Sequence, residues 1–109
     1  MNETVVHFDC HGDRLIGILH QPTSAQKKIG VIIVVGGPQY RVGSHRQFTI
    51  MARTLAAAGL PTLRFDYRGM GDSQGDFQGF EKIDEDIKSA IDALLKNFSG
   101  LNGVILWGL

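Results

Sequence analysis

The stretch IGVIIVVGGP, residues 29–38, is the most informative part of the sequence. Apart from one glycine, residues 29–35 are all β-branched. A strand that is apolar on both faces is typical of a parallel sheet that helices cover on each side. The Gly-Gly-Pro that follows indicates a loop at the carboxyl end of this strand, the edge at which open α/β sheets bind ligands.

Helices and strands are predicted to alternate after this loop. Ser44 and Gln47 form a capping-box pattern that opens a helix, and apolar residues recur at helical spacing up to Ala56. Gly59 and Pro61 end that helix. Residues 62–66 and 104–107 are predicted strands. Between them, Ile83, Ile87, Ala90, Ile91, Leu94 and Phe98 form one apolar face of a second helix.

Upstream, residues 3–9 and 14–20 are β-rich and are separated by the turn signal His-Gly-Asp, so they predict a hairpin. The predicted fold class is therefore α/β, with an N-terminal hairpin followed by β-α-β-α-β in a doubly wound, mostly parallel sheet. Such a sheet would be incomplete, because its last strand has an open edge and bare faces. We therefore expect residues 1–109 to be the N-terminal part of a single larger domain.

The composition excludes several classes of protein. The 109 residues are 43% hydrophobic and 20% charged, with a formal net charge of zero, so nothing indicates disorder or a nucleic-acid partner. No apolar run reaches the length of a membrane span, and the first residues lack the pattern of a signal peptide. With Cys10 as the single cysteine, we expect a cytoplasmic protein.

Two of the three predicted strand ends carry glycine-rich loops. In the first, Pro38 has no N–H, so Gly37 or Gln39 would be the backbone donor of an oxyanion hole, unless the segment is an ordinary tight loop. In the second, Gly69, Gly71 and Gly75 have a spacing one residue too long for a dinucleotide fingerprint. The alternative for this second loop is that Asp66 and Arg68 form a hydrogen-bonded pair that fixes its shape.

The third strand end is Gly108, followed by Leu109. If a nucleophile, any residue and a glycine came next, the pattern would be a nucleophile elbow, the sharp turn that exposes a catalytic side chain. His7, Cys10 and His11 match no zinc pattern, so no metal is expected, and Cys10 is predicted to be a small buried apolar residue. None of the four histidines is predicted to be a catalytic base.

Taken together, VIIVVGGP (31–38), LRFDYRGMGDSQG (63–75) and VILWGL (104–109) resemble the N-terminal half of an α/β-hydrolase. The pattern D-x-R-G-x-G-x-S, here Asp66, Arg68, Gly69, Gly71 and Ser73, is typical of the loop after the fourth strand of that fold. GGPQYRVGSHRQF (36–48) and RFDYRGMGDS (64–73) are similar to the type-1 hydrolases associated with the bacterial exosortase A system, which accompany exopolysaccharide and protein-sorting loci.

This resemblance implies an esterase- or thioesterase-like acyl hydrolase that acts on a small-molecule acyl substrate and needs no cofactor. Gly37 is similar to the oxyanion-hole glycine of the family and Gln39 is the second candidate, although Val35 stands where many members have histidine. The implied nucleophile, Ser or Cys, would be the first residue after Leu109, and the acid and histidine would follow it. The 109 residues alone are therefore expected to be inactive.

Two other interpretations remain at this stage. One is a nucleotide- or phosphate-binding half-domain that uses residues 69–75. The other is a non-catalytic interaction module that pairs with a partner chain through its exposed last strand.

Overall fold

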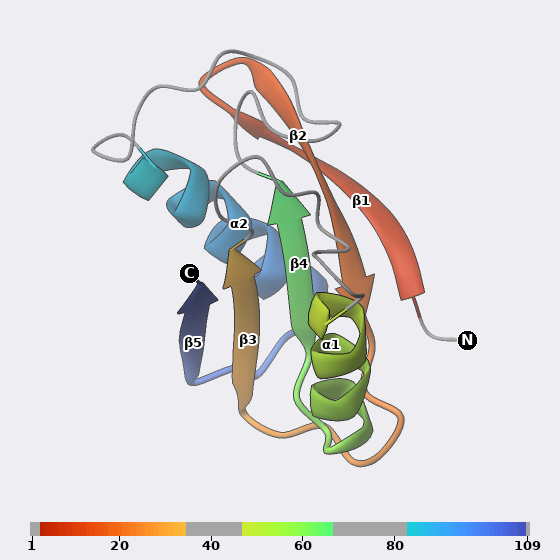
Figure 1. Cartoon of the computed structure of the whole chain (residues 1–109). Helices are drawn as coiled ribbons and strands as arrows, with labels where there is room; N and C mark the ends of the chain where they lie inside the picture. Colours follow the sequence, from red (N-terminus) through yellow and green to blue (C-terminus); the bar gives the residue numbers. More distant parts are fainter. Residues whose placement is uncertain (1–2, 35–46, 67–82, 109) are drawn as a thin grey trace.

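The computed structural model describes residues 3–34, 47–66 and 83–108 (Figure 1). Along the chain, the elements are the strands β1 (Glu3–Cys10), β2 (Asp13–His20) and β3 (Ile29–Val34), the helix α1 (Gln47–Ala57), the strand β4 (Thr62–Asp66), the helix α2 (Ile83–Asn97) and the strand β5 (Gly103–Gly108). This order confirms the predicted hairpin followed by β-α-β-α-β.

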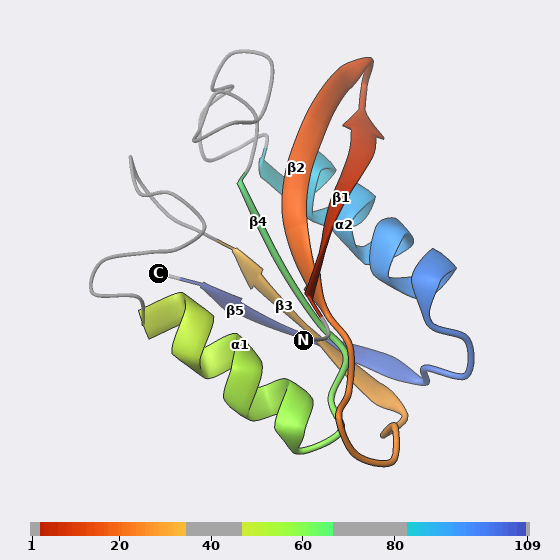
Figure 2. The same ribbon diagram turned by 90° about the vertical axis from the view of Figure 1, so that its right-hand side faces the viewer.

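All five strands form one sheet in the order β1-β2-β4-β3-β5. β3 is parallel to both β4 and β5, whereas β2 is antiparallel to β1 and to β4. The chain therefore passes from β3 to β4 in one direction, and then returns across β3 to β5 in the other. Right-handed crossovers in opposite directions place their helices on opposite faces, and Figure 2 shows α1 and α2 on the two sides of the sheet.

The residues of β3 alternate between these two faces. Val31 and Ile33 pack with Phe48 and Ala52 of α1. Ile32, between them, belongs to the cluster on the α2 face, together with Leu94. All three β3 side chains are buried, which confirms the strand with two apolar faces that the sequence predicted.

α1 ends where the sequence predicts, because only glycine fits the position of Gly59. Its φ of +94° lies in the left-handed region. A Cβ built there would also lie 2.3 Å from the carbonyl oxygen of Ala25, too close for any real side chain. This turn brings the connector between β2 and β3 against the end of α1, where the N–H of Lys27 donates to the Gly59 carbonyl at 2.8 Å.

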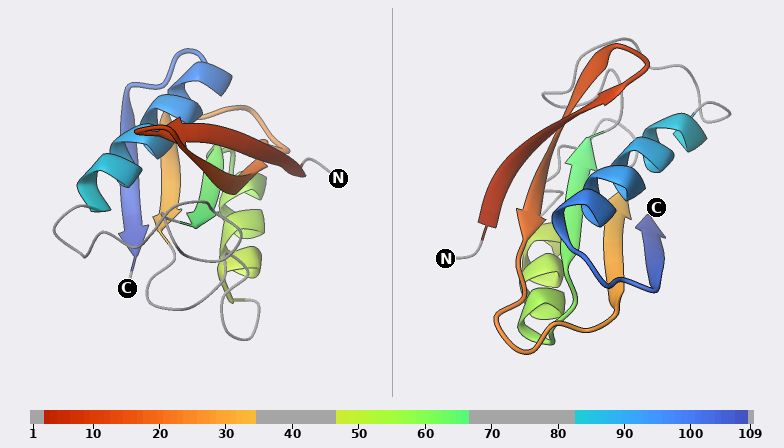
Figure 3. Two further views of the ribbon diagram at one scale, coloured as in Figure 1. Left: turned by 90° about the horizontal axis from the view of Figure 1, so that it is seen from above. Right: turned by 180° about the vertical axis from the view of Figure 1, so that it is seen from behind.

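α2 packs across the opposite face, on β1, β3 and β4 (Figure 3, right). Its predicted apolar stripe is confirmed at Ile87, Ala90, Ile91 and Leu94, which all belong to the core on this face or pack against it. Of the two helices that the structure describes, neither is long and apolar enough to cross a membrane.

β5 forms one edge of the sheet and is poorly covered. Ile105, Leu106 and Trp107 are 52%, 49% and 37% exposed. Because neighbouring residues of a strand point to opposite faces, apolar side chains are exposed on both faces of β5. The bare last strand expected from the sequence is therefore present among the described residues.

Candidate functional site

The carboxyl ends of three strands lie side by side at one edge of the sheet. Val34, the last residue of β3, is level with Phe65 of β4 and with Gly108 of β5. Neighbouring strands in a sheet are about 4.8 Å apart. The segments that follow β3, β4 and β5 therefore all leave the sheet within about two strand spacings of one another.

This edge is also where the strand order reverses. The connection after β3 leads to β4 on one side, and the next connection returns to β5 on the other side. Ligands of open α/β sheets bind in the crevice beyond the carboxyl ends at such a reversal. The three strand ends that the sequence singled out are therefore brought together.

The loop residues predicted for the site lie outside the described residues. This applies to the oxyanion-hole candidates Gly37 and Gln39, to Arg68, Gly69, Gly71 and Ser73 of the second loop, and to Leu109. Asp66 is described as the final residue of β4, where it is level with Ile16 of β2. What the structure adds to these predictions is the position of the strand ends from which the loops start.

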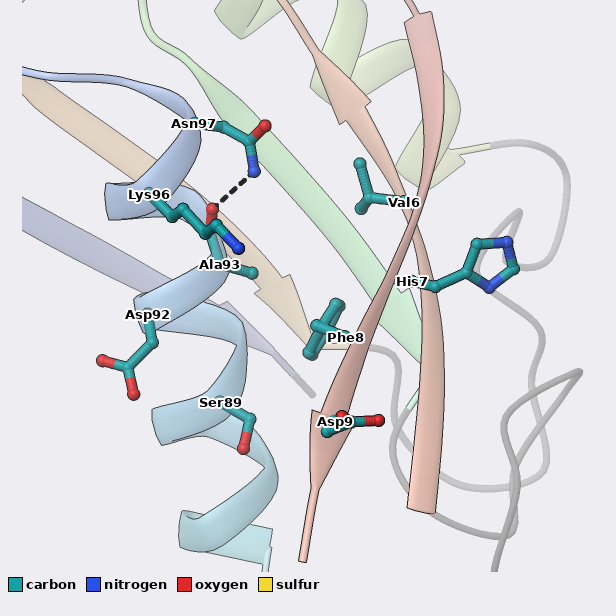
Figure 4. Close-up of a pocket in the computed structure, with 9 residues that line it drawn as sticks. All are labelled: Val6, His7, Phe8, Asp9, Ser89, Asp92, Ala93, Lys96 and Asn97. Atoms are coloured by element: carbon teal, nitrogen blue, oxygen red, sulfur yellow. Dashed lines mark hydrogen bonds between the residues drawn. The ribbon is translucent and has the colours of Figure 1, made fainter. Parts of the chain in front are cut away.

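A groove of about 520 Å³ lies elsewhere, between β1 and α2 (Figure 4). It is lined by residues 6–9 of β1 and by Ser89, Asp92, Ala93, Lys96 and Asn97 of α2. Val6 and Phe8 point toward α2, whereas His7 points away from it. β1 and β5 are the two opposite edges of the sheet, so this groove is separate from the crevice at the strand ends.

One histidine has partners that sequence reasoning missed. The Nδ1 of His20 lies 3.2 Å from the Glu3 carboxylate, and the Nε of Arg64 donates to the Nε2 of His20 at 2.8 Å. A histidine beside a carboxylate is a common arrangement of a catalytic base. His20, however, is 1% exposed, and its other ring nitrogen, Nε2, already accepts a hydrogen bond from Arg64. His20 is therefore a structural residue. The only sequence signal was the presence of a histidine and an arginine within predicted strands.

Cys10 and His11, which the sequence analysis considered as metal ligands and rejected, lie near the start of α2. Cys10 is buried, as predicted, and its thiol lies 3.5 Å from a carboxylate oxygen of Asp86. The exposed His11 lies 3.0 Å from Glu85. In the part of the chain that the structure describes, no three His, Cys, Asp or Glu side chains gather as metal ligands would.

Comparison with known proteins identifies the fold. An α/β serine hydrolase homologue from Coxiella burnetii is 25% identical and superposes with a TM-score of 0.78, covering 100% of this chain and 52% of the homologue. The Butyrivibrio proteoclasticus protein Est1E, in a structure with ferulic acid bound, is 25% identical, with a TM-score of 0.76 and coverage of 94% and 41%. An esterase from Pyrococcus furiosus is 20% identical, with a TM-score of 0.79 and coverage of 97% and 42%.

The chain has the fold of the α/β hydrolases. It spans about half the length of these structures or less. No family model and no curated protein matched the sequence. The α/β-hydrolase fold and the mixed five-stranded sheet thus agree with the fold class that the sequence predicted.

Proposed function

We propose that this chain is the N-terminal part of an acyl hydrolase of the esterase or thioesterase type. Gly37 or Gln39 would supply the oxyanion hole, and the nucleophile would be the first residue after Leu109. The observation that carries this proposal is the register of β3 and β5, in which Val34 is level with Gly108. The segment with the candidate donors therefore starts one strand away from the position where a nucleophile elbow would turn.

The chemistry follows from that arrangement. The nucleophile attacks the acyl carbonyl carbon while a histidine from beyond Leu109 takes its proton. The carbonyl oxygen becomes negative, and backbone N–H groups of the loop after β3 stabilise that charge. The histidine then gives the proton to the departing alcohol or thiol. Water next attacks the carbonyl carbon of the acyl-enzyme while the histidine takes its proton, and the histidine returns that proton to the nucleophile as the acid is released.

The parent gene beyond codon 109 is the first test. A Ser or Cys as the next residue, followed by any residue and a glycine, supports the proposal. The full-length protein should then hydrolyse p-nitrophenyl acetate or butyrate. Substituting that Ser or Cys with alanine should abolish turnover, whereas Ile50→Ala, at an exposed position on α1, should leave kcat and KM unchanged.

Two results would contradict this function. One is a gene that encodes no nucleophile after Leu109. The other is a full-length protein whose ester hydrolysis survives loss of the nucleophile. By this proposal, the nucleophile and its partners lie beyond residue 109, so the 109 residues alone should show no hydrolysis above buffer.

The exposed β5 supports a second candidate function, an interaction module. Leu106 and Trp107 offer apolar surface on both faces of an edge strand. An exposed strand of this kind is a template for pairing with another chain. If the gene stops after Leu109, a stable complex through β5 becomes the expected activity, and it should be lost in Leu106→Lys.

The cellular setting is part of the proposal as well. The proposed location of the protein is the cytoplasm. Residues 36–48 and 64–73 resemble the hydrolases associated with the exosortase A system. This resemblance supports a gene that lies near exopolysaccharide or protein-sorting genes. The genes that flank the parent gene test this directly. An exosortase gene among them would support the assignment, and its absence would remove it without affecting the hydrolase proposal.

A further inference from the structure

A cluster of polar side chains, buried at its centre and exposed at Arg53, connects α1 to the sheet on the face opposite α2. The His20 cluster, as we call it, consists of Glu3 of β1, His20 of β2, Arg64 of β4, and Thr49 and Arg53 of α1. His20, Arg64 and Thr49 are 1%, 4% and 6% exposed. Polar groups as buried as these must be satisfied by hydrogen bonds within the protein.

The geometry fixes where the proton of His20 lies. The Nε of Arg64 always carries hydrogen, so at 2.8 Å the Nε2 of His20 must accept with its lone pair. The proton of the neutral ring is therefore on Nδ1, where it donates to the Glu3 carboxylate at 3.2 Å. His20 thus accepts on one side and donates on the other.

Both ends of this chain of hydrogen bonds reach α1. Arg64 donates from Nη1 to the hydroxyl oxygen of Thr49 at 3.1 Å. On the other side, Arg53 donates to both oxygens of Glu3, at 2.7 and 3.1 Å. His20 itself lies on the sheet between these two connections, so the orientation of its ring affects both of them.

We propose that the His20 cluster is an acid-sensitive attachment of α1, which holds the helix on the sheet while His20 is neutral and releases it when Nε2 gains a proton. A protonated Nε2 would direct a hydrogen at the Nε–H of Arg64, so two donors and two positive charges would face each other at 2.8 Å. Among the residues that the structure describes, the charged groups that face His20 are Glu3 from β1, Arg64 from β4 and Arg53 from α1. This inference does not depend on the proposed acyl hydrolase activity.

Burial and the net effect of the nearby charges favour the neutral form of His20. Burial lowers the pKa of His20 to about 4, and the nearby Arg64 acts in the same direction, against the attraction of Glu3. Because the pKa in the released state is the ordinary 6.5, attachment is at full strength above that pH. It weakens as the pH falls from 6.5 toward 4 and changes no further below that.

Hydrogen exchange of individual backbone amides tests the proposal, because it reports the opening of each helix separately. Between about pH 7.5 and about pH 4.5, the opening constants of α1 amides should rise roughly 70-fold more than those of α2 amides. His20→Gln places an amide oxygen near Nε2 that accepts from Arg64 at every pH, so it should abolish this difference. His7→Gln, which removes an exposed histidine from β1, should preserve it.

Two results would overturn the proposal. One is an equal rise in α1 and α2, and the other is an unchanged difference in His20→Gln. A measurement that needs no variant covers the case in which His20→Gln does not fold. The ¹⁵N signals of the His20 ring at neutral pH should show hydrogen on Nδ1 and a bare Nε2, and hydrogen on Nε2 would contradict the attachment.

Discussion

The two faces of the sheet hold their helices by different means. On the α2 face, the contact is an apolar cluster made of Cys10, Leu15, Leu19, Ile32, Leu63, Phe65, Ala90 and Leu94. On the α1 face, a smaller apolar cluster of Val31, Ile33, Phe48 and Ala52 lies beside the His20 cluster. Apolar burial does not depend on protonation, whereas the hydrogen bonds of His20 do. By our proposal, the α1 face is therefore the one that responds to protonation of His20, whereas apolar contacts dominate the α2 face.

β4 shows how one strand serves both faces. Leu63 and Phe65 point to the α2 face, and Thr62 and Arg64 alternate with them on the α1 face. All four side chains are buried. The strand therefore contributes apolar area on one side and hydrogen-bonding groups on the other.

The largest expected effect is on the α2 face. Phe65→Ala should lower the free energy of unfolding by about 4 kcal/mol, because it removes a fully buried ring and leaves a cavity. The ring also packs against Phe8, with centroids 5.9 Å apart. Urea denaturation followed by circular dichroism measures the change, and a loss below about 1 kcal/mol would show that the apolar cluster is not the main support of this face.

A matched control for this measurement is on α1. Ile50 is 60% exposed, so Ile50→Ala removes a large apolar side chain without opening a cavity. Its effect on the free energy of unfolding should stay within about 0.5 kcal/mol.

An intermediate effect is expected on the α1 face. Thr49→Val keeps the shape of the side chain but removes the oxygen that accepts from Arg64 at 3.1 Å. The expected loss in the free energy of unfolding is about 1–2 kcal/mol, the cost of leaving one buried donor without this acceptor. Thr49→Ser, which keeps the hydroxyl, is the control in the same denaturation experiment. If Thr49→Val and Thr49→Ser have the same free energy of unfolding, the hydrogen bond from Arg64 to Thr49 does not help to hold α1 on the sheet.

Much of the fold was predictable because its signals are local. The β-branched run of residues 29–35 predicted a strand with two apolar faces, and the structure confirms this for Ile29–Val34. The helical spacing of residues 83–98 and the turn at Gly59 depend on neighbouring residues alone, and both are confirmed. The hairpin was equally readable, since its strands are separated by a two-residue turn.

Long-range pairing is what the sequence did not reveal. That β2 lies against β4 rather than β3 depends on contacts between residues more than forty positions apart, such as His20 with Thr62. The His20 cluster combines side chains from four elements in the same way. Periodicity reports which face a residue occupies but not which partner it meets there, so the partners of His20 were not predicted.

The candidate site was predictable in outline. The sequence singled out three strand ends as candidate ligand-binding positions, and the structure places the ends of β3, β4 and β5 at one edge. Gly37, Gln39 and the residues of the second loop are outside the described residues and stay predictions. Their roles depend on loop geometry and on residues beyond Leu109, neither of which a strand pattern contains.

The smallest effect is expected for an ion pair on the outer surface of α2. Lys88 and Asp92 lie 3.1 Å apart, one helical turn from each other, and their side chains are 79% and 62% exposed. Water and salt screen such a pair, so Lys88→Ala should change the free energy of unfolding by less than about 0.5 kcal/mol.

The effect of Lys88→Ala on the free energy of unfolding is best compared with that of Thr49→Val. Both substitutions remove one polar contact of about 3.1 Å, but only the contact with Thr49 is buried. Urea denaturation at low and high salt should therefore show a small, salt-dependent loss for Lys88→Ala and a larger, salt-independent loss for Thr49→Val. Equal losses would mean that burial does not set the strength of polar contacts in this protein, and the contrast between the two faces would then need another cause.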